Sequence, residues 1–156
     1  MTNKLVALSL FLFSQYILAD EKFSCPSKSE INHQQGVYTS NDGKWLGVSL
    51  GTENNGYINS FMHVIYIPYK NLDQKIGTLT SCKYSLEFGS VDMYFRDEDS
   101  LGNGGMYLSI EGEINWLKSP ELLYGSEAYM CTATHTNQCI LKRLTHDVVS
   151  AYKATF

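Results

Sequence analysis

The amino-acid sequence predicts an all-β fold, an antiparallel sandwich or barrel with at most one or two short helical turns. Short segments rich in β-branched and aromatic residues recur roughly every ten residues, with Gly, Asn, Asp and Pro between them. Aromatic residues make up 13% of the chain and charged residues 18%, where globular proteins average about 25% charged residues. This composition argues against disorder.

The amino-terminal residues predict a secretory signal peptide over residues 1–19. Lys4 supplies the positive start, an apolar run follows, and Ala19 is the small residue at the cleavage position. The apolar run is shorter than the ~20 residues that a membrane-spanning helix needs. We therefore expect cleavage after Ala19, no stable membrane insertion, and one β-domain over residues 20–156 in a periplasmic or secreted protein.

The charge balance argues against polyanionic partners. The formal net charge is −4, and loss of Lys4 with the signal makes the mature chain more acidic still. A mildly acidic surface offers no electrostatic footprint for nucleic acid or anionic lipid, so we expect neither as a partner.

Four cysteines lie in the mature part of the chain: Cys25, Cys82, Cys131 and Cys139. An even count in an exported chain predicts two disulfides, and three pairings are open. We favour Cys131 with Cys139, because seven intervening residues suit a hairpin tip. That choice leaves Cys25 for Cys82, which would pin the new amino terminus to the central strand.

Residues 76–88 predict the central strand. Every second residue is apolar, β-branched or aromatic, which places that set on a core face. The set comprises Ile76, Thr78, Thr80, Cys82, Tyr84, Leu86 and Phe88. We expect residues 60–67 and 91–96 as its neighbours in the sheet.

The elements before this strand begin with a lead-in at residues 25–31. Ser27 and Glu30 have the spacing of a capping box, but no periodic apolar run follows, so a turn is favoured over a helix. Strands are predicted at 36–40 and 44–50, around an Asn-Asp-Gly hairpin turn. The strand at 60–67 is apolar on both faces, which is typical of a central strand.

The elements after it are shorter. The predicted set is a hairpin of 106–110 with 113–117, a helical turn at 119–125, a hairpin of 127–132 with 138–144, and a tail at 145–156. The helical turn rests on Ser119 as cap, Pro120 in first position and Gly125 as stop. The tail is open between a short helix and a strand.

The acidic turn at residues 97–105 holds the best metal candidates. Asp97, Asp99 and Asn103 offer oxygen ligands of the kind that calcium prefers. Leu101 and Leu108 occupy positions where an EF-hand needs ligands. A solvated loop is therefore favoured, and no metal or cofactor is predicted.

The chain shows no pattern of catalytic residues. A Gly-x-Ser-x-Gly elbow is absent from the sequence, and the four histidines lack metal-ligand spacing. His63 alternates with apolar residues, which favours a hydrogen-bonded core histidine. His135 lies in the predicted disulfide loop, where we expect a surface position. We predict no catalytic residue.

Trp45 and Trp116 are the candidate binding residues. Flat aromatic rings stack on sugars and anchor protein partners. The same rings also fill the core of β-sheets, and for any single ring we favour that role.

The order of several short motifs resembles a known family. The motifs are Cys25-Pro26, Gly36-x-Tyr38, Trp45-x-Gly47, Ile58-x-x-Phe61, Gly77-x-Leu79-x-x-Cys82-x-Tyr84 and the final pair Cys131 and Cys139. Together they resemble a family of small exported Gram-negative bacterial proteins that is known as a domain of unknown function. The resemblance implies export and a single domain, and it assigns no activity and no site.

Three functions remain in view. The leading hypothesis is an exported, non-enzymatic domain that binds a protein or a glycan through a sheet face or a loop cluster. The first alternative is a small hydrolase with a carboxylate or histidine site, and the second is a secreted inhibitor or toxin. The oligomeric state is left open.

Overall fold

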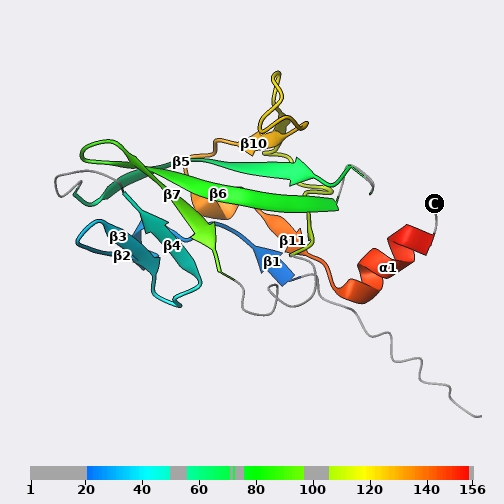
Figure 1. Ribbon diagram of the computed structural model, residues 1–156, viewed down its shortest axis with the longest axis horizontal. Helices are drawn as coiled ribbons and strands as arrows, with labels where there is room; N and C mark the ends of the chain where they lie inside the picture. Colours follow the sequence, from blue (N-terminus) through cyan, green and yellow to red (C-terminus); the bar gives the residue numbers. More distant parts are fainter. Residues whose placement is uncertain (1–20, 50–55, 71, 73–75, 97–105, 155–156) are drawn as a thin grey trace, which may run out of the picture.

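The computed structural model describes residues 21–49, 56–70, 72, 76–96 and 106–154. Within these ranges eleven strands form one connected, antiparallel sheet, which curls into a half-barrel (Figure 1). The prediction of an antiparallel all-β fold is confirmed. The predicted signal peptide and the acidic turn at 97–105 lie outside the described residues.

The bounds of the elements are as follows. The strands are β1 (Glu21–Phe23), β2 (Ile31–Gln34), β3 (Val37–Ser40), β4 (Trp45–Val48), β5 (Ile58–Pro68), β6 (Ile76–Leu86), β7 (Ser90–Phe95), β8 (Leu108–Ser109), β9 (Leu117–Lys118), β10 (Tyr129–Cys131) and β11 (Leu141–Arg143). The helical segments are the 3-10 turns η1 (Lys28–Glu30) and η3 (Thr136–Gln138) and the helix α1 (His146–Ala154).

Strand β6 is the hub of the sheet, as the alternation of residues 76–88 predicts. One edge of β6 pairs with β5, and the other is shared between β7 and β8. The neighbours expected at 60–67 and 91–96 are both confirmed. From β7 the sheet continues through β4 and β3 to β2, and from β8 through β11 to β1. Strand β10 lies between β5 and β9.

A single row of register partners forms the centre of the core. Its members, one each from β3, β4, β7, β6, β5 and β10, are Tyr38, Gly47, Met93, Cys82, Val64 and Cys131. All six are buried. Gly47 has to be glycine here, because a Cβ atom would lie 2.9 Å from the carbonyl oxygen of Asp92. Strands β4 and β7 therefore approach each other across a position without a side chain.

The inward face predicted for β6 is observed only in the second half of the strand. Cys82, Tyr84 and Leu86 are buried, but Phe88 lies beyond the strand and is 72% exposed. The register between β5 and β6 is irregular where Val64 pairs with Cys82 and Tyr66 pairs with Leu79. This irregularity changes the alternation of inward and outward side chains along β6. One residue of β5 there, Ile65, opposes two of β6, and Thr78 and Thr80 are only half-buried.

Both hairpins predicted in the second half of the chain are wrong. Strand β8 pairs with β6 and β11, whereas β9 pairs with β10. Strand β10 pairs with β5, whereas β11 pairs with β1 and β8. The turn at Ile110–Glu113 does form, through a hydrogen bond of 3.1 Å. Its two arms continue to different parts of the sheet, where each pairs with strands that are distant in sequence.

The helical turn predicted at 119–125 is wrong as well. Leu123 and Ser126 exchange two backbone hydrogen bonds across Tyr124 and Gly125, which makes this segment the tip of a β-hairpin. The φ angles of Tyr124 and Gly125 are 53° and 72°, as a two-residue hairpin turn requires. In Figure 1 this hairpin projects away from the sheet above β10.

The carboxy-terminal tail forms the helix α1, one of its two predicted alternatives. The N–H of Val149 donates to the carbonyl of Thr145, and the Val149 side chain is buried. No helix within the described ranges is long and apolar enough to cross a bilayer.

Candidate functional site

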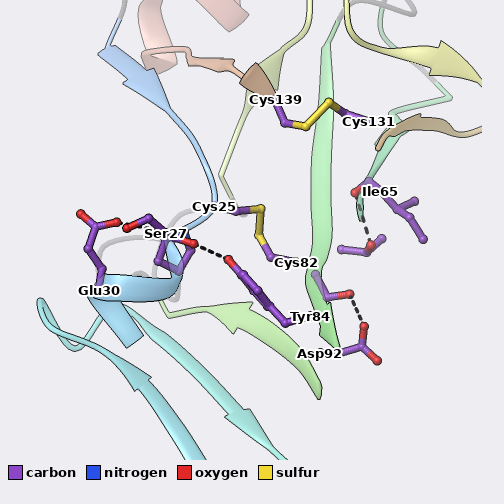
Figure 2. Close-up of a disulfide and its surroundings, with 12 residues drawn as sticks. Cys25, Ser27, Glu30, Ile65, Cys82, Tyr84, Asp92, Cys131 and Cys139 are labelled. Atoms are coloured by element: carbon purple, nitrogen blue, oxygen red, sulfur yellow. Dashed lines mark hydrogen bonds between the residues drawn. A yellow bond between two sulfur atoms is a disulfide. The ribbon is translucent and has the colours of Figure 1, made fainter. Parts of the chain in front are cut away.

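A polar cleft of about 520 Å³ opens beside the amino-terminal lead-in. Three segments from distant parts of the sequence line it: the lead-in around Ser24–Glu30, the start of β5, and the loop between Cys131 and Cys139. Both disulfides stand behind these walls (Figure 2). The cleft is therefore assembled by tertiary contacts and held by covalent bonds.

The first wall is the lead-in, which β6 anchors. Cys25 is bonded to Cys82 with a Cα–Cα distance of 6.0 Å. The next residue, Pro26, accepts a hydrogen bond through its carbonyl from the hydroxyl of Tyr84 (Figure 2). Both anchors come from consecutive inward residues of β6, since positions two apart share a face. The lead-in is thereby fixed over the core.

Glu30 closes a turn within this wall. Its Oε2 accepts from the Ser27 N–H at 2.7 Å, and its own N–H donates to the Ser27 carbonyl at 2.9 Å. These reciprocal bonds realise the capping-box spacing seen in the sequence, around the single 3-10 turn η1. Hydrogen bonds from the side chain and the backbone of Ser27 lower the pKa of Glu30 below its usual value. The carboxylate is therefore ionised and already engaged.

The second wall is the loop closed by the Cys131–Cys139 disulfide, whose Cα atoms lie 5.7 Å apart. The 3-10 turn η3 shapes the loop, and the His135 N–H donates to the Gln138 Oε1 at 3.2 Å. Thr136 is buried, which turns His135 and Asn137 outward to the cleft. The pairing of both disulfides is the one favoured from the sequence.

The floor comes from Asn59, Ser60 and Phe61 of β5. The Ser60 hydroxyl lies 2.7 Å from the Ser85 hydroxyl on the neighbouring strand. The Lys28 ammonium donates to the Asn59 carbonyl at 3.3 Å, which draws the lead-in toward the floor. Phe61 packs edge-on against Tyr84 with ring centroids 5.5 Å apart and contributes the aromatic part of the surface.

A family described as "Protein of unknown function (DUF3757)" matches residues 19–142. The chain belongs to this family. The match covers the lead-in, the floor and the disulfide loop, so both walls and the floor of the cleft lie within the family domain. No curated protein and no solved structure matches the chain.

In this DUF3757 protein a second, smaller cleft of about 240 Å³ lies on the other side of the lead-in. Asp42 and Trp45 line it together with Glu30. Asp42 accepts from the Ser40 hydroxyl and from the Lys44 N–H, and the Ser40 bond is the larger cause of the lowered pKa of Asp42. This carboxylate stabilises the hairpin turn between β3 and β4.

The two candidate tryptophans both lie in the core. Trp45 is 4% exposed, packs between Phe23 and Phe95, and is one of the residues that line the smaller cleft. Trp116 is 7% exposed, and its indole N–H donates to the Ile140 carbonyl at 2.9 Å. Neither ring presents a flat face to solvent, because each fills the space beneath a curled sheet.

The other predicted residues are dispersed. Asp97, Asp99 and Asn103 lie outside the described residues, and the described ranges contain no cluster of three metal-ligating side chains. His63 is half-buried on the outer face of β5 rather than in the core, because its register partner is the outward-facing Lys83. His33 stacks on Tyr38 at 4.6 Å, far along the sheet from His135.

Sequence reasoning did not single out Asn59 or Asn137. One signal was present: the segment between Cys131 and Cys139 is rich in Thr, Asn and Gln, with His135 at its centre. Polar side chains concentrated in a cross-linked loop are typical of binding surfaces held by a rigid scaffold. Only the fold brings that loop against the start of β5.

Proposed function

We propose that this protein is an exported, non-enzymatic binding domain whose 520 Å³ cleft holds a short segment of a glycan. The observation that carries the proposal is the chemistry of the lining. Hydroxyl and amide groups, from Ser24, Ser27, Asn59, Ser60, Thr134 and Asn137, surround the half-buried Phe61. Sugars present alternating hydroxyl groups and apolar C–H faces, which such a surface complements.

The charged groups of the cleft favour an uncharged ligand. The Lys28 ammonium is bonded to the Asn59 carbonyl, and the Glu30 carboxylate is bonded to the Ser27 N–H. Each charge is engaged by the protein itself, and the two have opposite signs. A neutral polar ligand gains more from the remaining hydroxyl and amide groups than a charged peptide would.

The rigidity of the walls lowers the conformational entropy that is lost on binding. Both disulfides brace the cleft, so the backbone of its walls loses little conformational freedom when a ligand binds. Its volume of about 520 Å³ lies within the usual range for small-molecule sites, roughly 300–1,000 Å³.

A hydrolase is the alternative, because Glu30 and His135 line the same cleft. A general acid needs a carboxyl group with a raised pKa. The pKa of Glu30 is instead lowered by its bonds to Ser27, and its oxygen already serves as a turn cap. This residue is better suited to structure than to proton transfer, and binding is therefore favoured over hydrolysis.

The proposal is tested with the mature chain, residues 20–156, on a glycan array, followed by calorimetry with the ligands that bind. Asn59→Ala and Asn137→Ala each remove an amide from the cleft. Each should weaken binding about 2- to 10-fold, as loss of one hydrogen bond of about 0.5–1.5 kcal/mol requires. Gln34→Ala, an exposed amide outside the cleft, is the matched control and should bind normally.

An array without binders, or equal affinity in the two cleft variants and the control, would reject the proposal. If a bound glycan is cleaved, and Glu30→Gln or His135→Ala abolishes cleavage with the fold intact, the hydrolase replaces it. Circular dichroism of each variant separates loss of binding from loss of fold.

A further inference from the structure

The outer face of the sheet, opposite the core, shows an ordered pattern of side chains. On either side of the buried row through Tyr38, Gly47, Met93, Cys82 and Val64, the neighbouring positions of each strand point outward. One outward row runs Val37, Val48, Asp92, Lys83, His63, and the other runs Thr39, Leu46, Tyr94, Ser81, Ile65, Met130.

Several apolar side chains of this face are exposed. Val37, Val48 and Tyr94 are 39%, 52% and 55% exposed, and Met62, at the irregularity of β5, is 42% exposed. Exposed apolar groups gathered on one surface mark interaction sites more often than isolated ones do. The exposed apolar groups fall on both sides of the face, with Val37, Val48 and Tyr94 on one side and Met62 of β5 on the other.

One pair of opposite charges lies at the centre of the face. Lys83 on β6 and Asp92 on β7 are direct register partners, and the Ser81 hydroxyl donates to the Asp92 Oδ1 at 3.3 Å. Figure 2 shows Asp92 on the far side of the sheet from the Cys25–Cys82 bridge. Burial, and then the Lys83 charge, lower the pKa of the neighbouring His63, which favours its neutral form. The face thus presents one cation beside one anion.

This arrangement is complementary to itself. A two-fold axis that lies in the plane of contact, parallel to the strands and between β6 and β7, exchanges the two halves of the face. This two-fold rotation places Lys83 of each copy against Asp92 of the other copy. The dimer therefore contains two such charge contacts. In the second row the rotation sets the exposed Tyr94 over the small, buried Ser81, and in the first row it sets the exposed Val48 against the half-buried His63. Sheets stacked with their strands nearly aligned pack in this manner.

We infer that the outer face of β3, β4, β7, β6 and β5 is the surface through which two copies of this protein form a two-fold dimer. The charge pair fixes the register, and the apolar residues on either side supply the burial. Two charge contacts and a few exposed apolar side chains make a weak dimer, with a dissociation constant on the order of micromolar.

The test measures mass in solution by sedimentation velocity of the mature chain from about 1 µM to about 1 mM, a range that brackets such a constant. The native protein should pass from the monomer mass to twice that mass. Lys83→Asp places an acidic group against Asp92 of the other copy, and Asp92→Lys places a basic group against Lys83 of the other copy. Each variant alone should remain a monomer at concentrations where the native protein is a dimer.

A mixture of the two variants provides the decisive measurement. In a dimer of one Lys83→Asp chain with one Asp92→Lys chain, both contacts again join an acid to a base. The mixture should therefore regain the dimer mass, which a variant that merely unfolds does not do. Lys118→Asp is the matched control: its ion pair with Glu127, 2.8 Å long, lies on the projecting hairpin away from this face.

A native protein that stays monomeric across the whole series overturns the inference, and so does a mixture that stays monomeric while its components are folded. Val48→Lys, a change at an exposed apolar position of the same face, offers a second check. It should weaken the dimer at least 10-fold while leaving thermal stability intact. Glycan binding at the cleft does not depend on this face, so the two proposals fail separately.

Discussion

The hydroxyl group of Tyr84 donates a hydrogen bond to the backbone carbonyl of Pro26, 58 residues earlier in the chain. Both groups are buried, and the bond lies beside the Cys25–Cys82 disulfide. One covalent bond and one hydrogen bond thus hold the lead-in to the middle of β6. The position of one cleft wall depends on both.

Replacing Tyr84 with Phe should destabilise the protein by about 1–3 kcal/mol, because the Pro26 carbonyl loses its donor inside the core. Burial raises the pKa of Tyr84, so its hydroxyl is a neutral donor at any ordinary pH. Urea unfolding monitored by tryptophan fluorescence measures the loss.

Tyr94→Phe is the matched control for this variant, since the Tyr94 side chain is 55% exposed. It should change stability by less than about 0.5 kcal/mol. Equal stability of Tyr84→Phe and the native protein would show that the bond to Pro26 contributes nothing.

The two disulfides should contribute unequally. Cys25 and Cys82 are separated by 57 positions, and Cys131 and Cys139 by 8. On chain-entropy grounds the longer loop is worth about 4 kcal/mol and the shorter about 2.5 kcal/mol. Paired Cys→Ser variants, compared by urea unfolding, should follow that order.

Peptide mapping under non-reducing conditions should recover only these two linkages. A Cys25–Cys131 linkage, or free thiols in the purified protein, would contradict the structure. Because the short bridge closes the loop that carries His135, its removal should impair ligand binding more than its effect on stability alone would suggest.

Gly47→Ala should destabilise the sheet by about 1–3 kcal/mol, the usual cost of an overpacked core position. The new Cβ would lie 2.8 Å from the Val91 Cγ2 and 2.9 Å from the Asp92 carbonyl oxygen. The backbone of β7 cannot rotate away as a side chain would. Gly43→Ala is the contrast: no atom lies within 4 Å of its Cβ, and only its φ of 72° opposes the change.

Stability should fall on acidification because of two turn carboxylates. Hydrogen bonds from Ser27 lower the pKa of Glu30 and one from Ser40 lowers the pKa of Asp42. A carboxyl group with a depressed folded pKa contributes its stability above the unfolded pKa, and that contribution is lost as the pH falls through the folded pKa.

Thermal unfolding between about pH 6 and pH 3 should therefore be less pH-dependent in Glu30→Gln and Asp42→Asn than in the native protein. Gln34→Ala, a change at an exposed uncharged residue, serves as control and should keep the native slope. Native slopes in both turn variants would show that neither carboxylate is linked to folding.

Local patterns in the sequence predicted much of the fold correctly. The alternation in residues 76–88 identified the hub strand, and Asn-Asp-Gly at 41–43 marked the turn between β3 and β4. Ser27 and Glu30 marked the capped turn of η1. Each of these features depends on residues only a few positions apart, where sequence order and spatial order coincide.

The errors arose where a strand is too short to show a period. Strands β8 and β9 have two residues each, so their partners are decided by distant surfaces and not by alternation. The segment around the hairpin tip at Tyr124–Gly125 contains the Ser, Pro and Gly that are typical of a helical turn. Its arms instead pair with each other beside β10 and form a hairpin. Export and a single domain over residues 20–156 stay predictions.

By itself the sequence determined an antiparallel, cysteine-bridged β fold with a central strand, because periodicity and turn chemistry are properties of neighbouring residues. Only the tertiary structure decided where the cleft lies and what the outer face presents. The cleft joins residues 24–30, 59–61 and 134–137, and the outer face depends on register across five strands. Register is set by non-local burial, and a shift of one residue would exchange the two faces of the sheet.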